Sequence, residues 1–184
     1  SLTISADRMG SPLFKKLQRA SIKIFYKFSH QIIAVSNGVK DDLSNMGVDK
    51  NKIQVIYNPV ISRPIQNSYK SNQPVQDWKR MPGVKLIAAG EMKPQKNFKN
   101  LIDSISYAKN TLGLNLQLLI LGDGEERECI EEKILSLKMQ DSIFLAGWVD
   151  DPLPYFKLAD LFILSSDYEG FGVVIVEAMS QGLN

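Results

Sequence analysis

The sequence predicts an α/β fold in which a Rossmann-like parallel sheet is flanked by helices. Short, nearly continuous apolar runs such as 84–89 and 116–121 alternate with segments of helical periodicity. Buried parallel strands have this continuous apolar character, and repeated strand–helix–strand units connect through right-handed crossovers. The chain has 184 residues, of which 44% are apolar, so it can bury a substantial core.

The first part of the chain predicts two short strands with a helix between them. An amphipathic helix is expected over 11–29, followed by a buried strand over 32–35. Ser36 is a suitable N-cap for the next helix, which Gly47 should end. A second short strand is expected over 53–57.

A polar segment over 61–83 separates this part from the rest. It contains Pro64, Pro74 and Pro82 and shows no lasting periodicity, so we interpret it as a connector between domains.

After residue 83 strands and helices alternate regularly. We expect strands over 84–89, 116–121, 142–146 and 160–165, and helices over 97–110, 125–138 and 152–158. The last strand leads through Gly170 and Gly172 into an apolar helix.

Composition and charge narrow the possible classes of protein. The net charge of +2 does not favour a general nucleic-acid binder. One cysteine, Cys129, and one histidine, His30, provide neither an internal disulfide nor a zinc site, which favours a reducing, cytoplasmic setting. No run approaches eighteen apolar residues, and the first residues lack a signal-peptide pattern.

A carboxylate in the final apolar helix needs an explanation. Glu177 lies among valine, isoleucine, alanine and methionine, and an unpaired buried charge costs several kcal/mol. Glu169 precedes it by seven intervening residues, so both can face a crevice at the helix N-terminus, beyond the carboxyl end of a strand. Backbone N–H groups near Phe171, Gly172 and Val173 would suit a phosphate there.

These residues resemble the Glu-x7-Glu signature of the retaining GT-B glycosyltransferases of family 4, also called glycosyl transferases group 1. Further motifs of that family occur in its order: Ile33–Ser36, Val55–Val60, Ala89–Gly90 with Lys96–Phe98, Leu121–Gly124, Phe144–Val149 and Ala159–Asp160. The resemblance extends from about Ser29 to the end, and it identifies the chain as a family member truncated at both ends.

The resemblance implies a division into domains. Residues 1–60 would be the end of an N-terminal acceptor-type domain, 61–83 the interdomain connector, and 84–184 most of the nucleotide-sugar donor domain, incomplete at its C-terminus.

The resemblance also implies roles for individual residues. Glu169 would contact the hydroxyls of the donor sugar and Lys96 the diphosphate, as the catalytic pair, while Glu177 would bind the ribose hydroxyls. The remaining donor-binding residues would be Gly90, Lys93, Gly122, Asp123, Val149, Gly170, Phe171, Gly172 and Val173. Simpler interpretations stay open: Lys96 as one of several surface lysines, Asp123 as an ordinary turn residue and Trp148 as a packing residue.

One position departs from the family pattern. Members commonly have an arginine directly after the glycine that corresponds to Gly90, whereas this chain has Glu91. A carboxylate there would repel a diphosphate unless it points away, although Lys93 could reach the same phosphate.

The implied activity is transfer of a sugar from a nucleotide-diphosphate donor to a glycan or lipid-linked acceptor, with retention of configuration and without a metal, in polysaccharide or lipopolysaccharide biosynthesis. Lys15, Arg19, Lys23 and Lys27 recur every four residues; this is either a solvated helix face or a contact with anionic membrane. The alternative is a non-catalytic nucleotide- or glycan-binding module. A dinucleotide-dependent oxidoreductase is disfavoured because the first strand is not followed by G-x-G-x-x-G.

Overall fold

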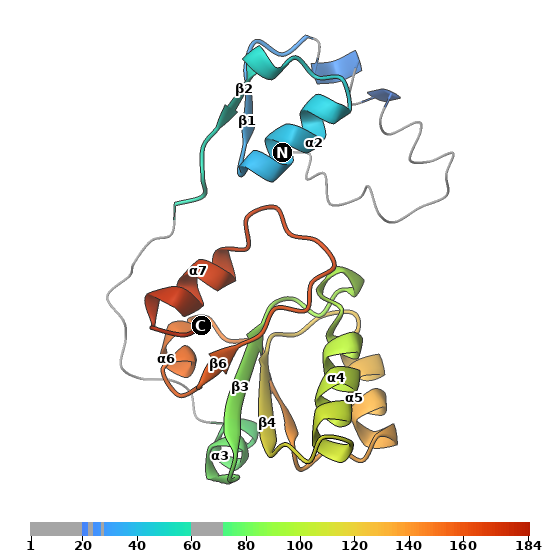
Figure 1. Cartoon of the computed structure of the whole chain (residues 1–184), viewed down its shortest axis with the longest axis vertical. Coiled ribbons are helices and arrows are strands. Elements are labelled where there is room, and N and C mark those ends of the chain that lie inside the picture. Colours follow the sequence, from blue (N-terminus) through green and yellow to red (C-terminus); the bar gives the residue numbers. More distant parts are fainter. Residues whose placement is uncertain (1–19, 22–23, 27, 60–71) are drawn as a thin grey trace. The chain divides into compact units, whose positions relative to one another are not determined.

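The computed structural model describes residues 20–21, 24–26, 28–59 and 72–184. The chain forms two compact units (Figure 1). Unit 1 comprises Ser1–Pro59 and Tyr168–Gly172, and unit 2 comprises Val60–Asp167 and Val173–Asn184.

Unit 1 contains a parallel strand pair covered by a helix. Strands β1 (Ile32–Ala34) and β2 (Ile53–Val55) pair in parallel, and helix α2 (Asn37–Asn45) and the 3-10 turn η2 (Lys50–Lys52) connect them. Ser36 Oγ accepts a hydrogen bond from Val39 N at 3.2 Å, which confirms the predicted N-cap. The small core consists of Ile32, Ala34, Leu43, Val48 and Ile53.

The helix expected over 11–29 lies mostly outside the described residues. Residues 20–21 and 24–26 are helical. The basic residues Lys15, Arg19, Lys23 and Lys27 are not among the described ones.

Unit 2 is built on a four-stranded parallel sheet of order β5-β4-β3-β6. Its strands are β3 (Val84–Ala89), β4 (Leu116–Leu121), β5 (Ile143–Gly147) and β6 (Leu161–Phe162). The predicted α/β fold with a Rossmann-like parallel sheet is confirmed. β6 is shorter than the predicted strand over 160–165, although Ile163 N still donates to Ile87 O at 2.8 Å.

Helices cover both faces of this sheet, as apolar parallel strands require. Alternate β3 residues face opposite sides: Leu86 and Ala88 share a core with α4 (Phe98–Asn110) and α5 (Arg127–Ser136). Ile87 and Ala89 share the other core with α3 (Gln73–Arg80), α6 (Leu153–Phe156) and α7 (Val173–Ser180). Figure 1 shows α4 and α5 side by side next to the sheet.

Helix α3 lies inside the segment for which the sequence predicted only a connector. Asn72 caps α3, accepting from Val75 N at 3.3 Å, and its Nδ2 donates to Ala146 O at 2.6 Å. Trp78 is fully buried, and its Nε1 donates to Gln117 O at 2.9 Å. The expected connector over 61–83 therefore contains a helix that packs on the sheet. Pro74 is compatible with that helix because it occupies the first turn, where its missing N–H costs nothing.

No helix among the described residues is long and apolar enough to cross a membrane.

Candidate functional site

The carboxyl ends of β3 and β4 and the loops that follow them form the centre of the candidate site. Gly90 N donates to Leu121 O at 3.0 Å, and Met92 N donates to Asp123 O at 2.8 Å. Gly122 N donates to Gly147 O at 2.8 Å, so the main chains stay bonded beyond the strands. Open parallel sheets bind ligands at this edge.

Gly122 allows the two loops to touch through their main chains. A Cβ atom added at Gly122 would lie 2.0 Å from Gly90 O, and the φ angle of Gly122 is +139°. Both the space and the backbone conformation therefore require glycine. Gly124 repeats the pattern, because its Cβ would lie 2.7 Å from Met92 O. The two loops therefore pack main chain against main chain at the carboxyl ends of β3 and β4.

The side chain of Lys96 lies across Gly90. Lys96 is the last residue of the 3-10 turn η3 (Pro94–Lys96), and a Cβ atom at Gly90 would lie 2.9 Å from Lys96 Cε. The structure thus brings together Gly90, Gly122 and Lys96, which the sequence analysis assigned to one site. A half-buried lysine at the carboxyl ends of the strands is suited to an anionic ligand.

Lys93 and Glu91 form an ion pair in the same loop. Lys93 Nζ lies 2.7 Å from Glu91 Oε2, and both side chains are about half exposed. The hydrogen bond to Glu91, and then its charge, raises the pKa of Lys93. The carboxylate that departs from the family pattern is therefore engaged by a neighbouring cation.

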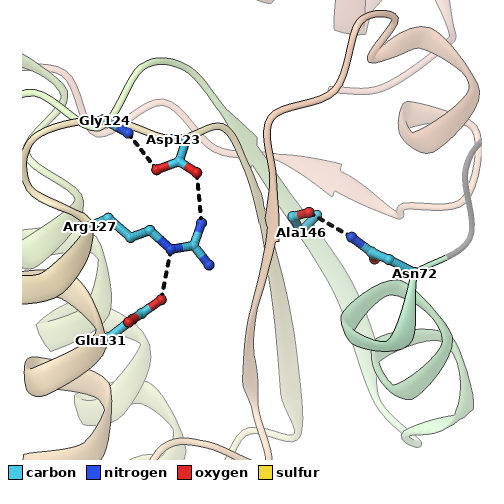
Figure 2. A network of polar contacts seen from close by, with 6 residues as sticks. All are labelled: Asn72, Asp123, Gly124, Arg127, Glu131 and Ala146. Atoms are coloured by element: carbon cyan, nitrogen blue, oxygen red, sulfur yellow. Dashed lines mark hydrogen bonds and ion pairs between the residues drawn. The ribbon is translucent and has the colours of Figure 1, made fainter.

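Arg127 joins Asp123 to the first turns of α5, a role that the sequence analysis did not foresee (Figure 2). Asp123 Oδ1 accepts from Gly124 N at 2.8 Å, and Asp123 Oδ2 accepts from Arg127 Nη1 at 3.1 Å. Arg127 Nε donates to Glu131 Oε1 at 2.8 Å. The signal in the sequence is the spacing of four between Arg127 and Glu131, which places these opposite charges on one face of α5. Asp123 thus stabilises the Gly122–Gly124 turn.

Glu177 lies on α7 and is half-buried. Burial, and to a smaller extent the carboxylate of Asp151, raises the pKa of Glu177. Asp151 Oδ1 accepts from Leu153 N at 3.1 Å and so helps to start α6. Within the described part of the chain Glu177 forms no ion pair. The sequence predicts a cost for burying this carboxylate. Among the described residues no cation offsets that cost.

The segment that contains Glu169 groups with unit 1. The rings of Phe171 and Tyr57 are 5.7 Å apart at 43°, and Asn37 Nδ2 donates to Tyr57 Oη at 3.2 Å. A Cβ atom at Gly170 would lie 3.6 Å from Val35 Cγ2. The structure therefore assigns Glu169, Gly170, Phe171 and Gly172 to unit 1, and Lys96, Val173 and Glu177 to unit 2.

The other residues that the sequence singled out differ in how far they are buried. Trp148 is 68% exposed and so does not pack in the core of unit 2, whereas Val149 packs against that core. His30 and Cys129 are exposed. The described ranges contain no group of three or more side chains that could ligate a metal.

Comparison with known proteins places the chain in a family. The sequence profile described as Glycosyl transferases group 1 matches residues 72–184. The chain belongs to the glycosyl transferases group 1 family. A second profile, Glycosyltransferase Family 4, matches residues 5–62. The group 1 match covers α3 and all four strands of unit 2, and hence the Gly90, Lys96 and Gly122 site.

Relatives in this glycosyltransferase family are longer than the chain. Lipopolysaccharide 1,6-galactosyltransferase of Escherichia coli (strain K12) is 30% identical over 157 residues, which cover 82% of this chain and 40% of the relative. The solved apo form of the lipopolysaccharide outer core galactosyltransferase WaaB has a TM-score of 0.64 at 25% identity, covering 85% of this chain and 42% of that one. Anabaena HepE in complex with UDP has a TM-score of 0.72 at 20% identity, over 98% of this chain and 49% of that one, and supports the fold alone. The chain spans less than half the length of these proteins.

Proposed function

We propose that the chain provides the nucleotide-sugar site of a glycosyltransferase. The enzyme would transfer a sugar from a nucleotide-diphosphate donor to a glycan or lipid-linked acceptor with retention of configuration. The observation that carries this proposal is the contact between the Gly90 and Gly122 main chains, with Lys96 lying over Gly90. The names of the relatives, which include lipopolysaccharide galactosyltransferases, support the same chemistry.

In this proposal the loop residues hold the diphosphate. The Lys96 ammonium and the backbone N–H groups near Val173 compensate the charge of the departing nucleoside diphosphate, because preorganised donors and cations stabilise charge as it develops. Gly90, Gly122 and Asp123 shape the floor beside the phosphates, and Lys93 and Val149 would line the site. We propose that no resident metal takes part.

In this proposal the two glutamates bind sugar hydroxyls. Glu177 would accept hydrogen bonds from the ribose hydroxyls, which favour its ionised form and offset the cost of its burial. Glu169 would orient the hydroxyls of the donor sugar, with Gly170, Phe171 and Gly172 forming its loop. As the C1–oxygen bond to the diphosphate breaks, the acceptor oxygen bonds to C1 on the same face, and its proton passes to a donor phosphate oxygen.

Calorimetric titration of the chain with UDP, GDP and ADP tests the proposal. We expect one of the three to bind, and we expect no transfer from the matching nucleotide sugar, because positioning an acceptor and excluding water need the part of the enzyme that this chain lacks relative to its relatives. Failure to bind all three would refute the nucleotide site. Efficient transfer by this chain alone would refute the expectation that it needs the remaining part.

The Glu91–Lys93 ion pair favours the second candidate, a non-catalytic binding module. The pair places a carboxylate in the phosphate loop and occupies one of its cations. A nucleoside diphosphate that binds to Glu91→Arg but not to the wild-type chain would favour this candidate.

We also propose a cytoplasmic enzyme. For Lys15, Arg19, Lys23 and Lys27 a solvated helix face is the simpler account, and contact with the inner face of the membrane is the alternative to be tested. Each basic residue near an anionic surface contributes about 1 kcal/mol. Sedimentation with vesicles of phosphatidylglycerol, but not with phosphatidylcholine alone, would support the contact. Equal recovery with both vesicles, or with neither, would refute it.

A further inference from the structure

Two segments that lie about seventy residues apart in sequence are joined at the edge of the candidate site. Ser165 Oγ donates to Lys96 O at 2.7 Å, and Asp167 N donates to Gln95 O at 3.0 Å. Asn97 Nδ2 donates to Asp167 Oδ1 at 2.8 Å. Every residue from Gln95 to Asn97 is therefore bonded to the segment that follows β6.

Asn97 has an unusual backbone for its position. Its φ and ψ angles are 48° and 42°, in the left-handed region, and it occupies the N-cap position of α4 without capping the helix with its side chain. An asparagine at an N-cap ordinarily accepts a hydrogen bond from the first turn. Here the side chain is directed to Asp167 instead. Glycine would satisfy the left-handed backbone alone, so what asparagine adds is the bond to Asp167.

The neighbouring residue is Lys96, the proposed diphosphate ligand. Its carbonyl is held by Ser165, its side chain lies across Gly90, and its backbone continues into the fixed left-handed turn at Asn97. A lysine side chain is a flexible stem, so a fixed main chain at Lys96 limits the region that its ammonium can reach.

We propose that Asn97 and Asp167 are a positioning pair that sets the direction of the Lys96 ammonium toward the phosphates of the ligand. The inference rests on the proposed nucleotide site and deepens it, because it assigns a role in phosphate recognition to two residues that touch no substrate. Asp167 acts as an acceptor for the Asn97 amide, and Asn97 fixes the turn that follows Lys96.

Asn97→Gly is the sharpest test. Glycine keeps the left-handed turn without strain and removes only the amide donor. We expect its affinity for the best-bound of UDP, GDP and ADP to fall about 3–10-fold, while its affinity for the parent nucleoside, followed by ligand NMR, changes less than about twofold. In a Lys96→Ala background Asn97→Gly should have no further effect.

Two other variants control this result. Lys138→Gly also replaces a residue with positive φ (55°), but it lies outside the site, and it should leave nucleotide affinity unchanged. Asp167→Asn retains an oxygen that can accept from Asn97, so it should bind nucleotide at least as tightly as the wild type. If Asn97→Gly does not fold, Asp167→Ala removes the same bond from the other side and carries the same expectation.

The outcomes separate the two proposals. A wild-type chain that binds none of the three diphosphates refutes the nucleotide site and this inference with it. Two results would make the pair merely structural and refute this inference alone, provided that the wild type binds. One is an equal loss of affinity for the nucleoside and the nucleoside diphosphate in Asn97→Gly. The other is a loss of affinity from Asn97→Gly in the Lys96→Ala background.

Discussion

Replacing Gly122 by alanine tests the contact on which the site is built. The new Cβ would lie 2.0 Å from Gly90 O, a backbone atom that no side-chain rotation can move away. Positive φ costs a non-glycine residue about 1–3 kcal/mol, and overpacking costs a further ~1–3 kcal/mol. Together these predict that Gly122→Ala lowers the free energy of unfolding by roughly 2–6 kcal/mol.

Gly113→Ala is the matched control in the same unit. Gly113 also has positive φ, +69°, but nothing lies within 4 Å of its added Cβ, so it bears only the conformational cost. The difference of about 1–3 kcal/mol should separate the two melting temperatures by roughly 2–12 °C, measured by circular dichroism at one pH. We also expect Gly122→Ala, but not Gly113→Ala, to weaken nucleoside diphosphate binding. Equal melting temperatures for the two variants would show that the loops are not in contact as described.

Further predictions concern the charged residues. Because burial, and then Asp151, raises the pKa of Glu177, the folded protein holds this proton more tightly than the unfolded chain and loses stability as the pH rises through the folded-state pKa. Glu177→Gln should therefore have a higher melting temperature than the wild type at neutral pH, and the two melting temperatures should converge below about pH 4. The binding free energy of Glu177→Gln for the nucleotide should weaken by ~1.5–3 kcal/mol. A lower melting temperature with unchanged affinity would make Glu177 a structural residue. Lys96→Ala should cost more nucleoside diphosphate affinity than Lys93→Ala, and both losses should shrink in high salt. Glu91→Arg should tighten binding, and unchanged affinity in all three loop variants would leave the loop as a solvated surface.

Most strands of unit 2 could be predicted because each is a continuous apolar run. β3 and β4 have the predicted bounds, and β5 is displaced by one residue. The predicted length of β6 is too great, because the polar residues after Ile163 form hydrogen bonds with the loop before α4 rather than with the sheet. Helix α3 was missed because polar residues and a proline conceal a helix whose buried face rests on only two side chains, Val75 and Trp78.

The residues of the candidate site could be predicted only where a local pattern marked them. Gly90 and Lys96 follow one strand within a few residues, and the structure brings them together. The hydrogen bond between Asn97 and Asp167 could not be predicted from a local pattern. The two residues lie in the loops after β3 and β6, and these loops meet only because the two strands pair in this register.

The position of α3 decides where a fragment that contains the sheet of unit 2 can start. A fragment that starts at residue 84, where the composition changes, would leave the Ile87 and Leu119 side of the sheet without the indole of Trp78. Such a fragment would present a bare apolar surface and aggregate, whereas one that starts at Asn72 would keep both the cap of α3 and its bond to Ala146. Boundaries drawn at changes of composition can thus pass through a core, and fragments of such chains that contain unit 2 should begin at the cap.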